Sequence, residues 1–126
     1  MRHAMGHFHE VLDDLKEPTR SLSRAIPETW AGFAQLHRSA VADGVLPAKV
    51  KELMALLVAV VKECEGCIGY HARAAAHLGA TEQEVAEMLG VALLMDGGTA
   101  STYGPLAWAA FKEFSAAVPL PEAKAS

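Results

Sequence analysis

The chain contains only two cysteines, and both lie in the stretch KECEGCIGYHARAAAHLG, residues 62–79. Cys64 and Cys67 have the spacing C-x-x-C, and His71 follows four residues after the second cysteine. Such a pair could be a dithiol that cycles with a disulfide, two ligands of a metal site, or two small apolar residues in a helical core. The surrounding residues, and the helices that carry them, must distinguish these alternatives.

A helix that begins at the cysteines would favour redox chemistry. Residues three and four apart share a helix face, so the two sulfurs can meet in a disulfide, with His71 on the same face one turn deeper. The positive end of the helix dipole stabilises a thiolate, and an imidazole can take or return a proton near neutral pH. This arrangement predicts a dithiol/disulfide pair with a proton acceptor beside it.

Glu52 is a candidate fourth member of this site. It is an isolated acidic residue at the entry to an otherwise apolar segment that precedes Cys64. If the two helices form an antiparallel hairpin that turns at residues 63–65, Glu52 and His71 differ in depth by about one turn, at about 1.5 Å per residue. We therefore expect the carboxylate to orient the imidazole, as the third group does in a catalytic triad. The alternative is a solvated charge that the helix dipole favours in a first turn.

The composition and the hydrophobic spacing predict an all-α fold of five to six helices that forms an oligomer. Alanine, the best helix former, occurs 24 times, and we find no convincing strand. Thr81 and Glu84 have the spacing of a capping box at the start of one helix. The apolar run of residues 53–61 has no polar face and predicts a helix that is buried all round. The expected helices cover residues 5–17, 27–44, 47–63, 65–78, 81–96 and 99–117.

Three segments follow from this pattern. Residues 1–26 should form an N-terminal helix that ends before Pro18, followed by a linker over residues 18–27. Residues 27–118 should form the main domain, with Gly66 and the cysteines at the break between two of its helices. Residues 119–126 should be a frayed tail.

Charge and apolar content restrict the functional class. The net charge of −4 and the pI near 5.8 argue against nucleic acid, which requires a basic face. The longest apolar run is nine residues, too short for a membrane span, and the N-terminus lacks the apolar region of a signal peptide. We therefore expect a cytoplasmic protein, in which two cysteines are catalytic or metal-binding rather than a structural staple.

The remaining histidines and aromatic residues suggest no second site. His3, His7 and His9 resemble a metal-binding cluster, but we expect them to be exposed, and we place His77 on the surface. The aromatic residues lie at helical spacing and should belong to the core or an interface. They are Trp30, Phe33, Trp108, Phe111 and Phe114.

The pattern Glu-x11-Cys-x-x-Cys-x3-His is preceded here by PAKVKELMALLVAVV and followed by HARAAAHLGATEQEVAEML. Together these segments closely resemble the AhpD-like branch of the carboxymuconolactone decarboxylase family, over about residues 27–116. The resemblance implies an all-helical alkylhydroperoxidase or related thiol oxidoreductase that assembles as a homo-oligomer, a trimer or hexamer. It implies no cofactor and no bound metal.

The resemblance also implies a role for each residue. Cys67 would be the peroxidatic thiol and Cys64 the resolving thiol, while Glu52 and His71 would relay the proton. The partners would be an organic hydroperoxide and a dithiol reductant, either a lipoyl protein or a thioredoxin-like one. The chain departs from the AhpD type at Gly66, where that type carries a second histidine between the cysteines.

Two other functions compete with this hypothesis. Decarboxylase members of the same family act on a lactone acid without a C-x-x-C pair, so the two cysteines count against a lactone enzyme. A zinc-stabilised helical scaffold without catalysis could use both cysteines, His71 and Glu52 as ligands. Structural zinc usually joins two pairs of ligands, and a second C-x-x-C pair is absent from the sequence.

Overall fold

The computed structural model describes residues 6–118, which form six α-helices and no strand, as expected for an all-α fold. The predicted tail over residues 119–126 and His3 lie outside the described residues. None of the helices within the described range combines the length and apolar character needed to cross a bilayer. The helices are α1 (His7–Ala25), α2 (Pro27–Val41), α3 (Ala48–Val61), α4 (Glu65–His77), α5 (Glu82–Asp96) and α6 (Gly98–Ala117).

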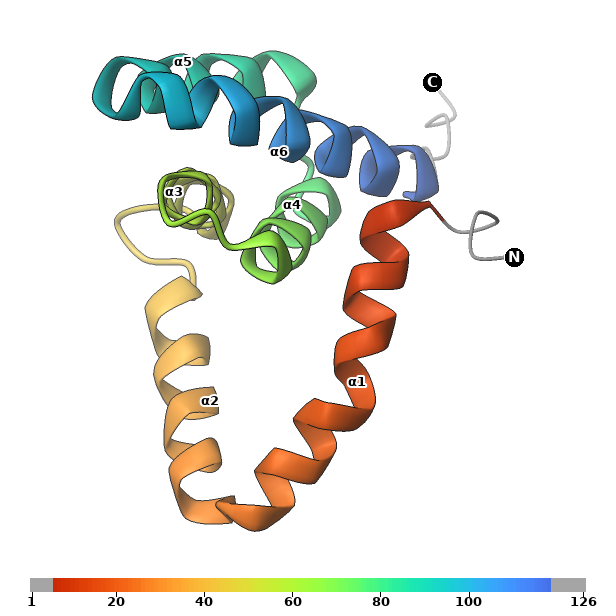
Figure 1. Ribbon diagram of the computed structural model, residues 1–126. Coiled ribbons are helices and arrows are strands. Elements are labelled where there is room, and N and C mark those ends of the chain that lie inside the picture. The colour runs from red at the N-terminus through yellow and green to blue at the C-terminus, as the bar shows by residue number, and fades with distance from the viewer. Residues whose placement is uncertain (1–5, 119–126) are drawn as a thin grey trace, which may run out of the picture.

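Helix α4 lies at the centre of the fold. It packs against α3 and α6, while α5 and α6 lie together as one layer above them (Figure 1). Many of the buried residues at these contacts are alanines, which allow helix axes to approach closely. The predicted inner face of α4 is confirmed, because Ile68, Ala72, Ala75 and Ala76 are all buried.

Helices α1 and α2 form a hairpin whose turn lies at the end of the molecule away from α5 and α6 (Figure 1). The first half of α1 shares the common core through Phe8 and Leu12, which are 2% and 3% exposed. The second half of α1 and the whole of α2 bury no residue. The hairpin is therefore anchored at one end and projects at the other.

The prediction that the first helix ends before Pro18 is wrong. Helix α1 continues through Pro18 to Ala25, so residues 18–25 are helical and not a linker. Proline lacks the N–H that would bond to the carbonyl four residues earlier, so the hydrogen bond from residue 18 to Asp14 is missing from this exposed part of the helix. Glu17, which accepts hydrogen bonds from Arg20 and Arg24, supports the helix on both sides of the proline.

Burial around α3 also differs from the prediction. The apolar helix is not buried all round, because Met54 and Val58 are 53% and 52% exposed. On α2, Phe33 is 59% exposed, whereas the aromatic residues Phe111 and Phe114 of α6 lie in the core as expected. A continuous apolar run does not distinguish a face covered by the same chain from one that only a second molecule could cover.

Glu113 of α6 fixes the start of α1. Its carboxylate accepts hydrogen bonds from the backbone N–H groups of Phe8 and His9, at 3.1 Å and 2.7 Å, and from His9 Nδ1. Burial raises the pKa of Glu113, but these hydrogen bonds outweigh it, so the pKa lies below the ordinary value. Gly6 precedes the helix with a φ of +81°, and a Cβ at Gly6 would meet the Glu113 carboxylate.

The start of α5 matches the predicted capping box. Glu84 N donates to the hydroxyl of Thr81 at 3.1 Å, and Thr81 N donates to the Glu84 carboxylate at 2.8 Å. The backbone hydrogen bond from Thr81 and the ion pair with Lys49 lower the pKa of Glu84. The reciprocal bonds satisfy two N–H groups that the helix itself cannot.

Candidate redox site

The two cysteines lie where the chain turns from α3 into α4. The turn occurs at Glu63, which has a left-handed φ of +56°, and Cys64 N then donates to the carbonyl of Ala59 at 3.0 Å. The break therefore precedes the cysteines, and Gly66, which we had placed at the break, lies inside the first turn of α4. This tight turn places Cys64 at the N-cap of α4 and Cys67 in its first turn.

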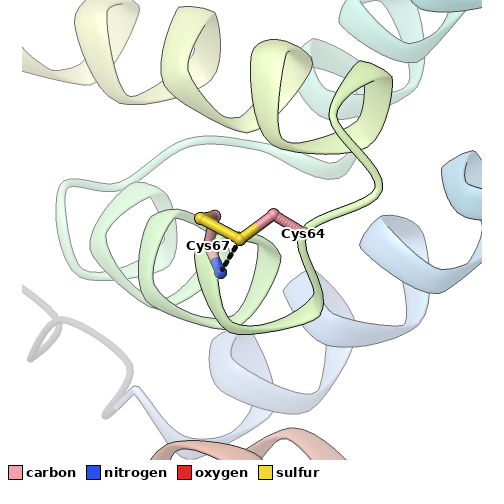
Figure 2. The surroundings of a disulfide bond; sticks show 2 residues. All are labelled: Cys64 and Cys67. Carbon is pink, nitrogen blue, oxygen red and sulfur yellow. Dashed lines mark hydrogen bonds between the residues drawn. A yellow bond between two sulfur atoms is a disulfide. The ribbon is translucent and has the colours of Figure 1, made fainter.

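Cys64 and Cys67 form a disulfide with a Cα–Cα distance of 5.2 Å (Figure 2). Cys64 Sγ also accepts a hydrogen bond from Cys67 N at 3.2 Å, shown as the dashed line in Figure 2. This sulfur therefore occupies the place of an N-cap oxygen, at the positive end of the helix dipole. Both cysteines are partly buried, so the site combines access from solvent with stabilisation of a sulfur anion.

Glu52 and His71 form a hydrogen-bonded pair at the site. His71 Nδ1 lies 2.7 Å from Glu52 Oε2, across the interface between α3 and α4. An ionised carboxylate only accepts, so Nδ1 carries the proton of this bond and Nε2 is the nitrogen that can exchange a proton. The Glu52 side chain is 5% exposed, and that of His71 is 22% exposed. Glu52 is thus a buried carboxylate with a specific partner, and the alternative of a solvated first-turn charge is wrong.

This pair is unusual within the described part of the chain. Between residues 6 and 118, Glu52 is the only charged residue that is buried. A buried carboxylate is strongly destabilising unless it is paired, so an apolar helix that carries one must have a partner for it. The structure provides His71, one helical turn beyond Cys67, as that partner.

Helix α1 covers the first turns of α4 on another side. A Cβ at Gly66 would lie 3.2 Å from Leu15 Cδ1, and a Cβ at Gly69 would lie 2.9 Å from Leu12 Cδ2. The two glycines therefore allow α1 to approach the cysteine-bearing turn closely. Leu15 of α1 therefore lies in the space next to Gly66 that a larger residue at position 66 would use for its side chain.

A second histidine faces the site from α2. The ring centroids of His37 and His71 are 6.4 Å apart, and the two rings are tilted by 47°. The position of His37 beside His71 could not be predicted from the sequence, because nothing in the spacing of residues 37 and 71 indicates that they meet. Only the return of α2 toward α3 and α4 brings them together.

The other histidines that the structure describes have different surroundings. His77 is exposed, as predicted. Exposed His7 hydrogen-bonds to Glu65 at 3.1 Å, while His9 is partly buried through its contact with Glu113, contrary to expectation. Across residues 6–118, no group of three or more histidine, cysteine, aspartate or glutamate side chains could hold a metal ion. The geometry therefore gives the zinc alternative no support.

A hollow of about 440 Å³ lies between α5 and α6, away from these residues. No residue of α3 or α4 lines it, so it does not provide a substrate pocket at the disulfide. Its walls are almost entirely apolar, with Ser101 as the main polar residue. The lining residues are Ala86, Leu89, Gly90, Leu93, Ala100, Ser101, Gly104, Pro105 and Trp108.

Known proteins of similar sequence and fold show which family this chain resembles. Residues 27–115 match the model of the carboxymuconolactone decarboxylase family. An uncharacterized protein of Cupriavidus necator is 34% identical over 83% of this chain and 93% of its own length. An uncharacterized protein from the cox locus of Paracoccus denitrificans is 35% identical over 75% of this chain and 86% of its own.

A solved structure extends this similarity to the fold. The crystal structure of an apo carboxymuconolactone decarboxylase family protein from Legionella pneumophila superposes with a TM-score of 0.83 at 40% identity. The match covers 86% of this chain and 96% of the Legionella chain. The family match spans most of the residues that carry the site, from α2 to α6. The chain therefore belongs to the carboxymuconolactone decarboxylase family.

Proposed function

We propose that this protein is an AhpD-like thiol oxidoreductase that reduces organic hydroperoxides with the Cys64–Cys67 pair. The observation that carries the proposal is the combination of a disulfide at the start of α4 with the buried Glu52–His71 pair one turn deeper. A disulfide alone would suit a structural role. A buried carboxylate that orients an imidazole beside it is instead the arrangement of an activated nucleophile.

The first step oxidises Cys67. His71 accepts the thiol proton through Nε2, while Glu52 holds Nδ1 and stabilises the imidazolium. The thiolate attacks the terminal oxygen of the hydroperoxide, the O–O bond breaks, and the departing alkoxide takes a proton from water to leave as an alcohol, while His71 releases the thiol proton to solvent. Cys67 becomes a sulfenic acid, and the hydroperoxide has accepted two electrons.

The second step forms the disulfide that the structure shows. The Cys64 thiol attacks the sulfenic sulfur of Cys67, and the hydroxyl leaves with a proton as water. In the disulfide the Cα–Cα distance is 5.2 Å, within the ordinary range for such bridges. A dithiol partner then supplies two electrons: one of its sulfurs attacks the disulfide, its second sulfur releases the protein, and both cysteines are thiols again. A lipoyl group or a thioredoxin-like protein has the required chemistry.

Gly66 should affect hydroperoxide reduction more than thiol–disulfide exchange. With no imidazole between the cysteines, the relay consists of Glu52 of α3 and His71 of α4. Exchange between thiols and disulfides needs less help with protons than cleavage of an O–O bond. We therefore expect disulfide exchange to be the more robust activity and hydroperoxide reduction the slower one.

The alternative of a lactone decarboxylase is less well supported. That reaction has no use for a disulfide, and here two cysteines occupy the helix start next to the only buried carboxylate of residues 6–118. A direct test is to assay the purified protein against several hydroperoxides, with lipoyl and thioredoxin reductants compared in parallel and a lactone acid as a separate substrate. Turnover with a hydroperoxide supports the proposal, whereas turnover of the lactone acid alone contradicts it.

The active form is proposed to be a homo-oligomer, a trimer or hexamer. Large apolar side chains are exposed on α5, where Leu94 and Met95 are 81% and 75% exposed, and separately on α2 and α3. Leu93 of α5 also lines the apolar hollow between α5 and α6. Exposed apolar residues that follow one another on a helix, as on α5, are typical of an interface. Light scattering on the purified protein should give three or six times the 13.4 kDa chain mass, and Leu94→Lys should lower it.

A further inference from the structure

We infer that His37 of α2 is a positioning residue of the thiol site that carries the proton between His71 and solvent. The inference rests on the proposed function of Cys64 and Cys67. It gives the site a second imidazole that comes from a different helix, since none lies between the cysteines. The pathway would run from the cysteine thiol to His71 and then to His37.

The geometry of the two rings fits a relay through one water molecule. Their centroids are 6.4 Å apart, and each ring nitrogen lies about 1 Å from its centroid, so the nearest nitrogens are at least about 4 Å apart. That lower limit excludes a direct hydrogen bond and leaves room for a bridging water. Because His71 Nδ1 is held by Glu52, Nε2 is the nitrogen that both takes the thiol proton and releases it toward this water.

The exposure of the side chains to solvent increases along the proposed proton pathway. Glu52 is buried, His71 is partly buried, and His37 is exposed. A proton that leaves the thiol thus meets groups of increasing access to water. His37 lies on a helix that buries no residue, so packing of the described chain gives no reason for a histidine at this position.

Helix α1 crowds the position between the cysteines on α4. Leu15 of α1 lies 3.2 Å from the place of a Cβ at Gly66, so the leucine would have to shift to admit a side chain there. Helix α1 covers one side of the turn that carries the cysteines. A second proton acceptor can therefore lie on the other side, which α2 approaches. In the hairpin, α1 occupies the first side and α2 provides His37 on the second.

Several charged groups on α1, α2 and α3 have partners other than His37. On α2 itself the guanidinium of Arg38 donates to the side-chain amide oxygen of Gln35. The pairs are Asp13 with Lys16, Glu17 with Arg20 and Arg24, Arg38 with Gln35, Lys49 with Glu84, and Lys51 with the carbonyl of Ala42.

The test separates the two half-reactions. Reduction of the disulfide by dithiothreitol and oxidation of the reduced protein by cumene hydroperoxide are followed in single turnovers by quenching and alkylation of the thiols. His37→Gln is compared with wild type, and His77→Gln serves as the matched control because His77 is exposed near the end of α4. Each variant is measured at low buffer concentration and again with added imidazole.

We expect His37→Gln to slow both half-reactions about tenfold at low buffer, less than the loss of a direct general base. Added imidazole should restore the rate, and His77→Gln should behave as wild type. Unchanged rates in His37→Gln, or a slow rate that imidazole does not restore, would overturn the inference. If the wild type fails to react with hydroperoxides, the proposed function is wrong, but the reduction half-reaction still decides the role of His37.

Discussion

Replacing Glu52 by glutamine removes the negative charge of the site and nearly nothing else. Glutamine has the same shape, and its amide oxygen can still accept the hydrogen bond from His71 Nδ1, which is 2.7 Å long in the native protein. The imidazole keeps its orientation but loses the carboxylate that stabilises its positive charge. The variant therefore isolates the electrostatic contribution of Glu52.

The size of that contribution follows from the geometry. Two unit charges about 4 Å apart interact by about 4 kcal/mol at an effective dielectric constant of about 20. The His71 side chain is 22% exposed, so solvent weakens the interaction, and we expect about 2–3 kcal/mol in the activation free energy. At about 1.4 kcal/mol for each factor of ten, Glu52→Gln should slow oxidation of Cys67 by roughly 30- to 150-fold.

The assay is a single-turnover reaction of the reduced protein with cumene hydroperoxide at pH 7. Glu87→Gln is the charge-matched control, because Glu87 lies exposed on α5. The stability of Glu52→Gln, measured by urea unfolding, should equal or exceed that of wild type, since a buried charge is removed. A rate within twofold of wild type would refute the claim that Glu52 acts electrostatically on the site.

Three further predictions concern the helices that position the site. Glu113→Gln should destabilise the fold by about 1–3 kcal/mol at pH 7 because it loses the charged acceptor at the start of α1. Because folding lowers the pKa of Glu113, the difference in unfolding free energy between wild type and variant should be complete above pH 4.5. It should disappear as the pH falls below that value, which urea titrations at several pH values can measure. Gly69→Ala places a Cβ 2.9 Å from Leu12 and should cost about 1–3 kcal/mol, with increased proteolysis of α1. Phe111→Ala should cost about 3–5 kcal/mol in thermal unfolding, because Phe111 is 1% exposed.

The local features of the site could be predicted from the sequence because they depend on spacing along one helix. The interval between Cys64, Cys67 and His71 fixes their common face, whatever surrounds them. The contact between Glu52 and His71 required one further assumption, that α3 and α4 form an antiparallel hairpin. The structure brings these two side chains to hydrogen-bonding distance.

Features that depend on packing between distant helices could not be predicted. The contact of His37 with His71 and the capping of α1 by Glu113 join residues far apart in the sequence, with no spacing rule between them. The continuation of α1 through Pro18 could not be predicted, because a proline inside a helix costs about 3 kcal/mol and therefore predicts an end there. The exposed face of α3 was missed because apolar runs look alike in a core and at an interface.

The central claim is that Cys67 is the thiol that reacts with hydroperoxide. The most direct measurement is consumption of cumene hydroperoxide by Cys67→Ser, with a dithiol as reductant and with Cys64→Ser measured in parallel. We predict no turnover in Cys67→Ser, whereas Cys64→Ser without the dithiol should react once and stop at a sulfenic acid that a dimedone probe labels on Cys67. Turnover at the wild-type rate in Cys67→Ser would contradict the claim.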